Sequence, residues 1–305
     1  MKKAVWLAQT GAFYLFTLLV ALLPASLTLP AGRLVGALMW HALPKRRRIA
    51  LENISLSFPF MTASPLWNST FTTPEEVARA TFRNIGTSLI EVCRLYHGKG
   101  GDLMAAFRVE GMEHYLAARQ RGKGVIFLTG HCGNWELGAL AYGRLFKLPM
   151  WVVARRQNNP YLNRMVEKMR MRYDNRVIYK ENAMRGMLQV IRSNGLIGLL
   201  ADQAAFSDNG SLIPFLGRYA WATKGPVVIT RKTGVALLPV FIHREGDSHV
   251  LTILPECVLG GASGEEGIAA DVRTYSSFIE EFIIRHPADW YWVHRRWKRA
   301  GEMAA

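Results

Sequence analysis

The residues best suited to chemistry stand in the segment Thr129-Gly130-His131-Cys132-Gly133-Asn134-Trp135-Glu136, where four residues separate a histidine from a glutamate. An imidazole can take a proton from a hydroxyl group, and a nearby carboxylate can hold its tautomer and stabilise the imidazolium. We therefore interpret His131 and Glu136 as a candidate base and acid pair. An ordinary turn histidine and a first-turn glutamate favoured by the helix dipole would show the same spacing.

The residues on either side predict a strand, a tight turn and a helix. Val125–Thr129 is a short apolar run typical of a buried strand, and Trp135–Phe146 has the pattern of a helix. The two glycines of the motif permit a sharp turn between them. His131 would then stand at a helix N-terminus, where backbone amides can also stabilise an oxyanion.

Cys132, next to His131, offers a second reading as a thiol nucleophile, although small buried cysteines are commoner than reactive ones. Cys93 and Cys257 are far away and form no Cys-x-x-Cys pair, which argues against a disulfide framework or a zinc knuckle. The other histidines show no ligand spacing, so we expect no metal and no cofactor. The sequence also lacks a nucleophile elbow, a Walker loop and a dinucleotide fingerprint.

Further candidate residues fall where an α/β site is expected. Asp202 follows the predicted strand Leu196–Ala201, and ligands bind at the carboxyl ends of strands in open α/β sheets. An aspartate there can also be a helix cap. Arg155 follows another predicted strand and Arg170 lies on the next helix, where arginines suit phosphate or oxyanion binding, as does a solvated basic face. Asn134, inside the motif, joins them as a candidate for the same task.

Composition limits the partners. Lys and Arg number 38 against 23 Asp and Glu, which gives a net charge of +15. Such an excess indicates an anionic partner: nucleic acid, acidic lipid headgroups or an acidic carrier protein. Half of the residues are hydrophobic and nine are tryptophan, which suits a membrane surface better than a freely soluble nucleic-acid binder.

The N-terminal segment predicts a membrane anchor. No charged residue occurs from Ala4 to Gly32, and about 20 apolar residues are enough to cross a bilayer. A signal peptide is less consistent, because a small-residue cleavage site is missing and Leu34 to Leu43 continues the apolar run. Because Pro24 and Pro30 can break a helix, an interfacial or re-entrant segment stays open.

The basic cluster Lys45-Arg46-Arg47-Arg48 follows the apolar segment and is denser than the Lys2-Lys3 pair before it. By the positive-inside rule, the domain after the anchor faces the cytoplasm. No convincing boundary follows, so we predict an anchor over residues 1–44 and one cytoplasmic catalytic domain over 45–305.

The remaining pattern predicts an α/β fold with a mixed central sheet flanked by helices, because apolar runs alternate with helical patterns. Ser57 to Pro74 is rich in Pro, Ser, Thr and Asn and predicts an irregular loop, after which a helix runs to Tyr96. The other predicted strands are Met150–Ala154, Arg176–Tyr179, Ala236–His243 and Val250–Leu254. The other predicted helices are Pro160–Tyr173, Asn182–Ser193, Lys224–Thr233 and Asp271–His286.

The C-terminal stretch 285–299 interleaves aromatic and basic residues. Such a pattern can bind single-stranded nucleic acid by stacking and phosphate contact. It also fits an anionic membrane interface, where Trp and Tyr lie at headgroup depth. With an apolar N-terminus in the same chain, we favour the membrane interpretation.

Together these segments resemble the bacterial lipid A biosynthesis acyltransferases, the lauroyl and myristoyl transferases of the lysophospholipid acyltransferase-like superfamily. The resemblance covers nearly the whole chain. Its segments are the apolar N-terminus, Arg46–Pro59, Phe82–Gly86, the His131-x4-Glu136 box, Asn159-Pro160, Ala201-Asp202-Gln203, Pro214–Gly217 and Pro287–Lys298. The box is shared across the superfamily, whereas the segments ending at Pro59 and Lys298 are specific to this branch. One departure is the loop from Phe60 to Thr73, which is longer than is usual in the family.

The resemblance implies transfer of a fatty acyl chain from an acyl carrier protein thioester to a hydroxyl of a lipid A precursor, a phosphorylated glycolipid. It implies that His131 is the general base and Glu136 its partner, and it places Arg170 and Asp202 in the functional set. It also implies a bacterial inner-membrane enzyme whose catalytic domain lies on the cytoplasmic face.

Other interpretations stay open. Coenzyme A is an alternative acyl donor, and a lysophospholipid or another glycolipid such as a phosphatidylinositol mannoside is an alternative acceptor. A non-enzymatic alternative is a membrane-tethered nucleic-acid-binding protein that uses the C-terminal stretch. It leaves the placing of His131, Glu136 and Asp202 unexplained, so we expect no nucleic-acid partner.

Overall fold

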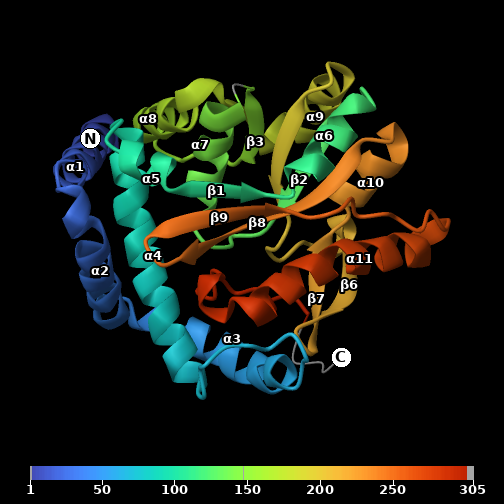
Figure 1. Cartoon of the computed structure of the whole chain (residues 1–305), viewed down its shortest axis with the longest axis horizontal. Coiled ribbons are helices and arrows are strands. Elements are labelled where there is room, and N and C mark those ends of the chain that lie inside the picture. The colour runs from blue at the N-terminus through green and yellow to red at the C-terminus, as the bar shows by residue number, and fades with distance from the viewer. Residues whose placement is uncertain (1, 147, 301–305) are drawn as a thin grey trace.

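A mixed seven-stranded sheet with the strand order β1-β9-β8-β2-β5-β3-β4 forms the centre of the protein. The computed structural model in Figure 1 describes residues 2–146 and 148–300. Neighbouring strands in this sheet are parallel, except for the antiparallel pair β8 and β9. The predicted α/β class with a mixed sheet is therefore confirmed. The strands of the sheet are β1 (Phe107–Glu110), β2 (Val125–Thr129), β3 (Met150–Ala154), β4 (Arg176–Tyr179), β5 (Leu196–Leu200), β8 (Ala236–Glu245) and β9 (Ser248–Ile253).

Helices flank the sheet on both faces. Along β2, Val125 and Phe127 pack in one core cluster with residues of α6 and α7, whereas Ile126 and Leu128 pack in another with residues of α9, α10 and α11. Because side chains alternate along a strand, a strand buried on both faces reads as a continuous apolar run. The helices from α4 onward are α4 (Pro74–Tyr96), α5 (Gly101–Ala105), α6 (Met112–Gln120), α7 (Trp135–Phe146), α8 (Pro160–Arg170), α9 (Ala183–Arg192), α10 (Gly225–Thr233) and α11 (Gly264–Arg285).

The predicted strands and helices of the catalytic region are present, with ends that shift by a few residues. The largest shift is in α11, which begins at Gly264 rather than Asp271. Strand β1 and the hairpin of β6 (Gly210–Phe215) and β7 (Arg218–Thr223) were not predicted. The hairpin turn has positive φ at Leu216 and Gly217. Its Leu-Gly pair is not the Asn-Gly sequence that usually marks such a turn.

The prediction of an irregular loop from Ser57 is wrong for its first part. Helix α3 (Pro44–Thr62) continues through Pro59, a residue that normally breaks a helix interior. Ile54, Ser57 and Met61 are fully buried along it. Tertiary packing of this face therefore outweighs the local penalty of the proline.

The N-terminal apolar segment forms two helices rather than one. Helix α1 (Lys2–Ala21) is followed by the short 3₁₀ helix η1 (Ala25–Leu27) and by α2 (Thr28–Ala42), and Pro24 stands at the break. Helix α1 is long and apolar enough to cross a membrane, by length and composition only. Helix α2 instead lies along α4, as the left side of Figure 1 shows.

Helices α2 and α4 touch at backbone level through glycines. A Cβ atom added to Gly86 of α4 would lie 2.3 Å from the carbonyl oxygen of Gly32 and 2.4 Å from the amide nitrogen of Gly36. Both glycines belong to α2. Only residues without a side chain permit this close approach, which fixes α2 against the helix that forms one wall of the site described below.

Gly86→Ala is therefore expected to destabilise the protein by about 1–3 kcal/mol, the usual penalty for overpacking. Gly11→Ala in α1 is the matched control, because a Cβ there would meet no atom within 4 Å. Alanine is the better helix former, so this control should leave stability unchanged or slightly raised. Denaturant unfolding in detergent measures both, and equal midpoints would contradict the close contact.

Candidate active site

The pairing of β2 with β5 brings two of the predicted site residues together. The strands run parallel with Thr129 beside Leu200, so the residues that follow them emerge at the same edge of the sheet. His131 Nδ1 lies 2.8 Å from Asp202 Oδ1, and the backbone amide of His131 donates to Asp202 Oδ2 at 2.9 Å. The carboxylate thus holds both the ring and the backbone of the histidine.

This arrangement fixes the tautomer of His131. With Nδ1–H donating to Asp202, the Nε2 atom carries the lone pair and accepts from the Gln203 amide at 3.1 Å. Trp290 Nε1 donates to Asp202 Oδ2 at 2.8 Å, and Asp202 is only 3% exposed. Because Asp202 engages Nδ1, Nε2 is the nitrogen left for a substrate hydroxyl, which would take the place of the Gln203 amide.

The charges around the pair favour a basic histidine. Burial lowers the pKa of His131, but the Asp202 carboxylate, with a smaller contribution from Glu136, raises it above its ordinary value. Burial also raises the pKa of Asp202, yet the bonds from His131 and Trp290 hold it well below its ordinary range. Asp202 therefore stays ionised beside the imidazole.

Glu136 does not bond to the imidazole, which differs from the pairing expected from the sequence. It forms a two-point ion pair with Arg170, whose Nη2 and Nε lie 2.6 and 3.3 Å from its carboxylate oxygens. The Tyr96 hydroxyl donates to the same carboxylate at 3.0 Å. Glu136 follows the turn on α7, where the helix directs its side chain toward α8 and α4 rather than back to His131.

The C-terminal segment closes the turn that carries His131. Gly133 N donates to the Asp289 carbonyl and Tyr291 N to the His131 carbonyl, at 2.6 and 3.1 Å. Gly133 has φ of +52°, and a Cβ there would lie 2.1 Å from the Ile242 carbonyl oxygen. A side chain at this position would displace the turn.

A cavity of about 240 Å³ opens beside His131. Apolar and small polar side chains of α4 line one wall, and the turn after β2 with the segment 288–291 lines another. Glu136 also lines it, so both members of the sequence motif face the same space. The rings of Trp135 and Tyr291 stand 5.0 and 6.0 Å from the His131 ring. An apolar cavity with one basic nitrogen suits an acyl or lipid substrate.

The remaining sequence candidates lie elsewhere or are already engaged. Asn134 caps α7, since its side-chain oxygen accepts from Leu137 N at 3.1 Å and its amide donates to Glu91 at 2.8 Å. Arg155 is exposed after β3 and does not line the cavity. Cys132 is fully buried, and burial, with Asp202 and Asp289, raises the pKa of its thiol well above its ordinary value. This protonated state argues against a thiol nucleophile.

Within residues 2–146 and 148–300, no group of histidine, cysteine, aspartate and glutamate side chains is arranged to hold a metal ion.

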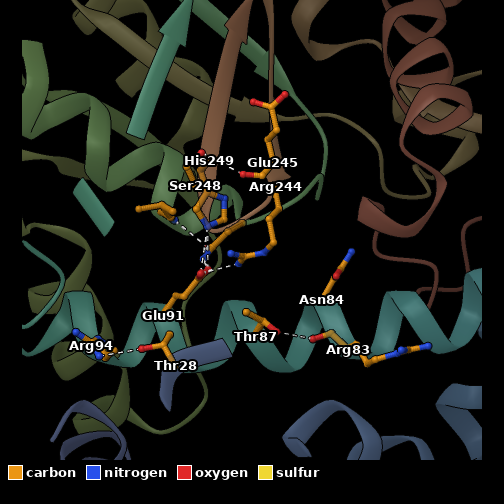
Figure 2. A network of polar contacts seen from close by, with 12 residues as sticks. Thr28, Arg83, Asn84, Thr87, Glu91, Arg94, Arg244, Glu245, Ser248 and His249 are labelled. Atoms are coloured by element: carbon orange, nitrogen blue, oxygen red, sulfur yellow. Dashed lines mark hydrogen bonds and ion pairs between the residues drawn. The ribbon is translucent and has the colours of Figure 1, made fainter. Parts of the chain in front are cut away.

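A buried polar network stands behind the turn and is drawn in Figure 2. Glu91 of α4 is fully buried and binds Arg244 Nη2 at 2.6 Å, His249 Nε2 at 3.1 Å and the Asn134 amide at 2.8 Å. Burial raises the pKa of Glu91, but His249 and Arg244 lower it more, so the carboxylate keeps its charge. The network ties α4 and the β8–β9 hairpin to the start of α7.

Glu91→Gln is expected to destabilise the protein by about 3–5 kcal/mol, because it removes one charge of a buried pair and leaves Arg244 without its counterion. Glu75→Gln, in an exposed pair with Arg79, is the matched control and should change stability by about 0–1 kcal/mol. Unfolding midpoints in detergent measure the difference. Equal shifts of the unfolding midpoint in the two variants would mean that the buried ion pair of Glu91 stabilises the protein no more than the exposed pair of Glu75.

The membrane-interface and nucleic-acid readings of the C-terminal stretch are both wrong for its central residues. Trp290, Trp292, Arg296 and Trp297 are at most 6% exposed and belong to the protein interior. Asn53, itself buried, donates to the Trp292 and His294 carbonyls at 2.8 Å each. The segments Arg46–Pro59 and Pro287–Lys298, which are the most specific in the resemblance, therefore bind each other. Trp290 of the second segment supports the site through its hydrogen bond to Asp202.

Several site residues were not identified from the sequence. Trp290, Tyr96, Glu91 and Asp289 come from segments far from the His131 motif, and no spacing rule connects them to it. Gln203 stood inside a recognised segment but had no role until the structure placed it against His131 Nε2. Burial raises the pKa of Asp289 to about 7, although Arg244 and Asn84 lower it.

A family model of bacterial lipid A biosynthesis acyltransferases matches residues 2–299, so the chain belongs to that family and is an O-acyltransferase. Among its relatives, the lipid A biosynthesis palmitoleoyltransferase of Escherichia coli K12 is 28% identical over 88% of this chain and 83% of the relative. The lauroyltransferase of the same organism is 24% identical over 97% of this chain and 93% of the relative. A phosphatidylinositol mannoside acyltransferase of Mycolicibacterium smegmatis is 25% identical over 73% of each chain.

Proposed function

We propose that this protein transfers a fatty acyl chain from an acyl carrier protein thioester to a hydroxyl of a lipid A precursor. The observation that carries the chemistry is the bond between Asp202 and His131 Nδ1, which leaves Nε2 as a base at the edge of an apolar cavity. The acceptor follows the two relatives from Escherichia coli, which are named as acyltransferases of lipid A biosynthesis and match most of this chain.

In this mechanism no covalent enzyme intermediate forms. His131 Nε2 takes the proton of the acceptor hydroxyl, and the oxygen attacks the thioester carbonyl carbon. The tetrahedral intermediate collapses, the C–S bond breaks, and the departing thiolate receives the proton from the imidazolium. The products are the new ester and the free thiol. Ionised Asp202 stabilises the imidazolium during both steps.

Glu136, which lines the cavity, acts as the ion-pair partner of Arg170 rather than as the hydrogen-bond partner of the base. Their proposed role is electrostatic. The Glu136 charge raises the pKa of His131, and the Arg170 guanidinium, bound to Glu136, adds positive charge from outside the cavity lining that would favour an oxyanion. Glu136, itself held by the Tyr96 hydroxyl, keeps the guanidinium in one orientation, which is the preorganisation that oxyanion stabilisation requires.

We also place the enzyme at a membrane, with the domain after residue 44 on the cytoplasmic face. Large apolar side chains are exposed along α1 and α2, including Leu15, Leu19, Leu34 and Leu38, each between 57% and 61% exposed. An apolar surface that spans two helices is unusual for a monomeric soluble protein and suits contact with lipid. Exposed Lys45 and Arg48 at the start of α3 follow this surface, as expected for a cytoplasmic flank.

A phosphatidylinositol mannoside or another glycolipid is the second candidate acceptor, and the mycobacterial relative supports it. Coenzyme A is the second candidate donor. The net charge of +15 attracts either anionic donor, because complementary charge mainly accelerates encounter.

Mass spectrometry of lipid A and total phospholipids, from cells with and without the gene, tests the acceptor. We expect one acyl chain of defined mass to be missing from lipid A in the deletion strain and restored by the intact gene. Unchanged lipid A together with altered phospholipids or mannosides would show that one of these lipids is the acceptor instead of the lipid A precursor. Purified protein supplied with either acyl carrier protein thioester or acyl coenzyme A then decides the donor.

A further inference from the structure

A second cavity, of about 470 Å³, lies between α2, α4 and β8. Three arginines from these three elements line it: Arg33, Arg83 and Arg244. Asn84 lines both this cavity and the one beside His131, so the two spaces adjoin across one residue. A basic cavity next to the candidate base is not explained by the acyl transfer step itself.

The charge in this cavity is only partly neutralised. Among the described residues, Arg33 and Arg83 form no ion pair with an acidic side chain, and both are exposed. Arg244 is bound by Glu91, but its Nη1 atom is buried and has no hydrogen-bond partner in the described part of the chain. Three guanidinium groups against one carboxylate leave an excess of positive charge and free N–H donors.

The structure also holds one of these arginines firmly. Figure 2 shows Arg244 directed toward Glu91, with Thr87, Asn84 and Arg83 farther along α4. Glu91 is in turn bound by His249 and Asn134, which are each 2% exposed. A guanidinium in such a setting loses little conformational entropy on binding, and its planar fork matches phosphate oxygens.

We propose that this cavity binds a phosphate group of a substrate, an inference that rests on the proposed function and extends it. Arg33, Arg83 and Arg244 bind the phosphate oxygens, while the reacting group extends past Asn84 into the cavity at His131. Two substrates carry such a group: the phosphorylated lipid acceptor, and the phosphopantetheine arm of the carrier protein. The position of Arg33 on α2, beside exposed Leu34, places the cavity next to the surface proposed to meet lipid.

Kinetics of Arg33→Gln, Arg83→Gln and Arg244→Gln test the site, with Arg192→Gln as the matched control. Arg192 is exposed at the end of α9 and lines neither of these cavities. Each cavity variant is expected to raise KM for the phosphate-bearing substrate about tenfold, with a smaller change in kcat, because a charge-assisted bond is lost. Arg244→Gln also removes the counterion of the buried Glu91 and can therefore destabilise the fold. The variants of the exposed Arg33 and Arg83 do not have this effect, so they test the site independently of folding.

Two comparisons identify the phosphate. KM for a phosphorylated lipid A precursor is compared with KM for the same lipid after phosphatase treatment. KM for the acyl phosphopantetheine thioester, the arm of the carrier protein, is compared with KM for the acyl pantetheine thioester, which lacks only the phosphate. A rise confined to the phosphorylated lipid assigns the cavity to the acceptor, and a rise confined to the phosphopantetheine thioester assigns it to the donor. Either result supports a phosphate site.

Unchanged KM values for both substrates in the Arg33 and Arg83 variants, or equal rises in Arg192→Gln, would overturn the proposal. Equilibrium binding of the phosphorylated and phosphatase-treated lipids to the full chain in detergent, without donor, separates this failure from failure of the proposed function. Phosphate-dependent binding without any acyl transfer would contradict the reaction but not the site. Equal binding of the two lipids, with no effect on the donor KM, would contradict the site alone.

Discussion

Replacing His131 by alanine is expected to lower kcat for acyl transfer by about 10²–10⁴-fold, the usual contribution of a positioned general base. His131→Asn should lose as much, although its side-chain amide can still donate to Asp202. The pair of variants therefore separates loss of the base from loss of the bond that supports the turn. Initial rates with a fixed acyl carrier protein thioester measure the effect.

His114→Asn is the matched control, because His114 lies on α6, about one third exposed, and does not line the cavity. It should keep the activity of the unmodified protein. An unfolding curve for each variant shows whether the fold is retained. Full activity in His131→Ala, with the fold retained, would make the proposed mechanism wrong.

The same histidine sets the pH dependence. Imidazole acts as a base only when neutral, and the pKa of His131 lies above its ordinary value of 6.5 because Asp202 and Glu136 offset the effect of burial. The rate of acyl transfer should therefore fall as the pH drops through this raised pKa. In Glu136→Gln the acid limb should move to lower pH, because a negative charge near the imidazole is lost.

Asp202→Asn is expected to lower kcat by about 10²–10⁴-fold while leaving the shape of the site nearly unchanged. An amide at this position can offer N–H to Nδ1, which stabilises the tautomer that carries its proton on Nε2. The nitrogen that faces the cavity then has no lone pair for the substrate hydroxyl. Asp208→Asn, at an exposed aspartate that accepts from the Asn209 amide, is the matched control and should be without effect.

The tautomer gives a readout that separates Asp202 from Glu136. Nitrogen-15 chemical shifts of His131 should report a proton on Nδ1 in the unmodified protein and in Glu136→Gln. In Asp202→Asn they should report a proton on Nε2. The opposite pattern would restore the pairing of His131 with Glu136 that the sequence spacing first indicated.

The sequence was sufficient for the motif and for the elements on each side of it. An apolar run, two glycines and an amphipathic helix follow one another between Val125 and Phe146, and the signals that predict them are local in the sequence. The same is true of the predicted helix from Pro74 to Tyr96, whose Thr73 cap and Glu76 form a capping box. Local signals failed at α3, where packing of a buried face carries the helix through Pro59.

The partner of the base required the tertiary structure. Spacing along one segment suggested Glu136, but the pairing of β2 with β5 sets Asp202 beside His131 across 71 positions of sequence. The aromatic and basic C-terminus looked like a surface pattern, yet it is buried because Asn53 and the core bind it. Composition gives the number of charged and aromatic residues. It does not tell which of them lie at the surface and which lie in the interior.

The sequence by itself thus indicated the type of reaction, the family and the candidate base, since these depend on residue types at short, fixed spacings. The tertiary structure decided which carboxylate binds His131, which arginines have an acidic partner, and which tryptophans are buried. Those outcomes depend on strand order and helix packing, which bring together residues that no local periodicity connects.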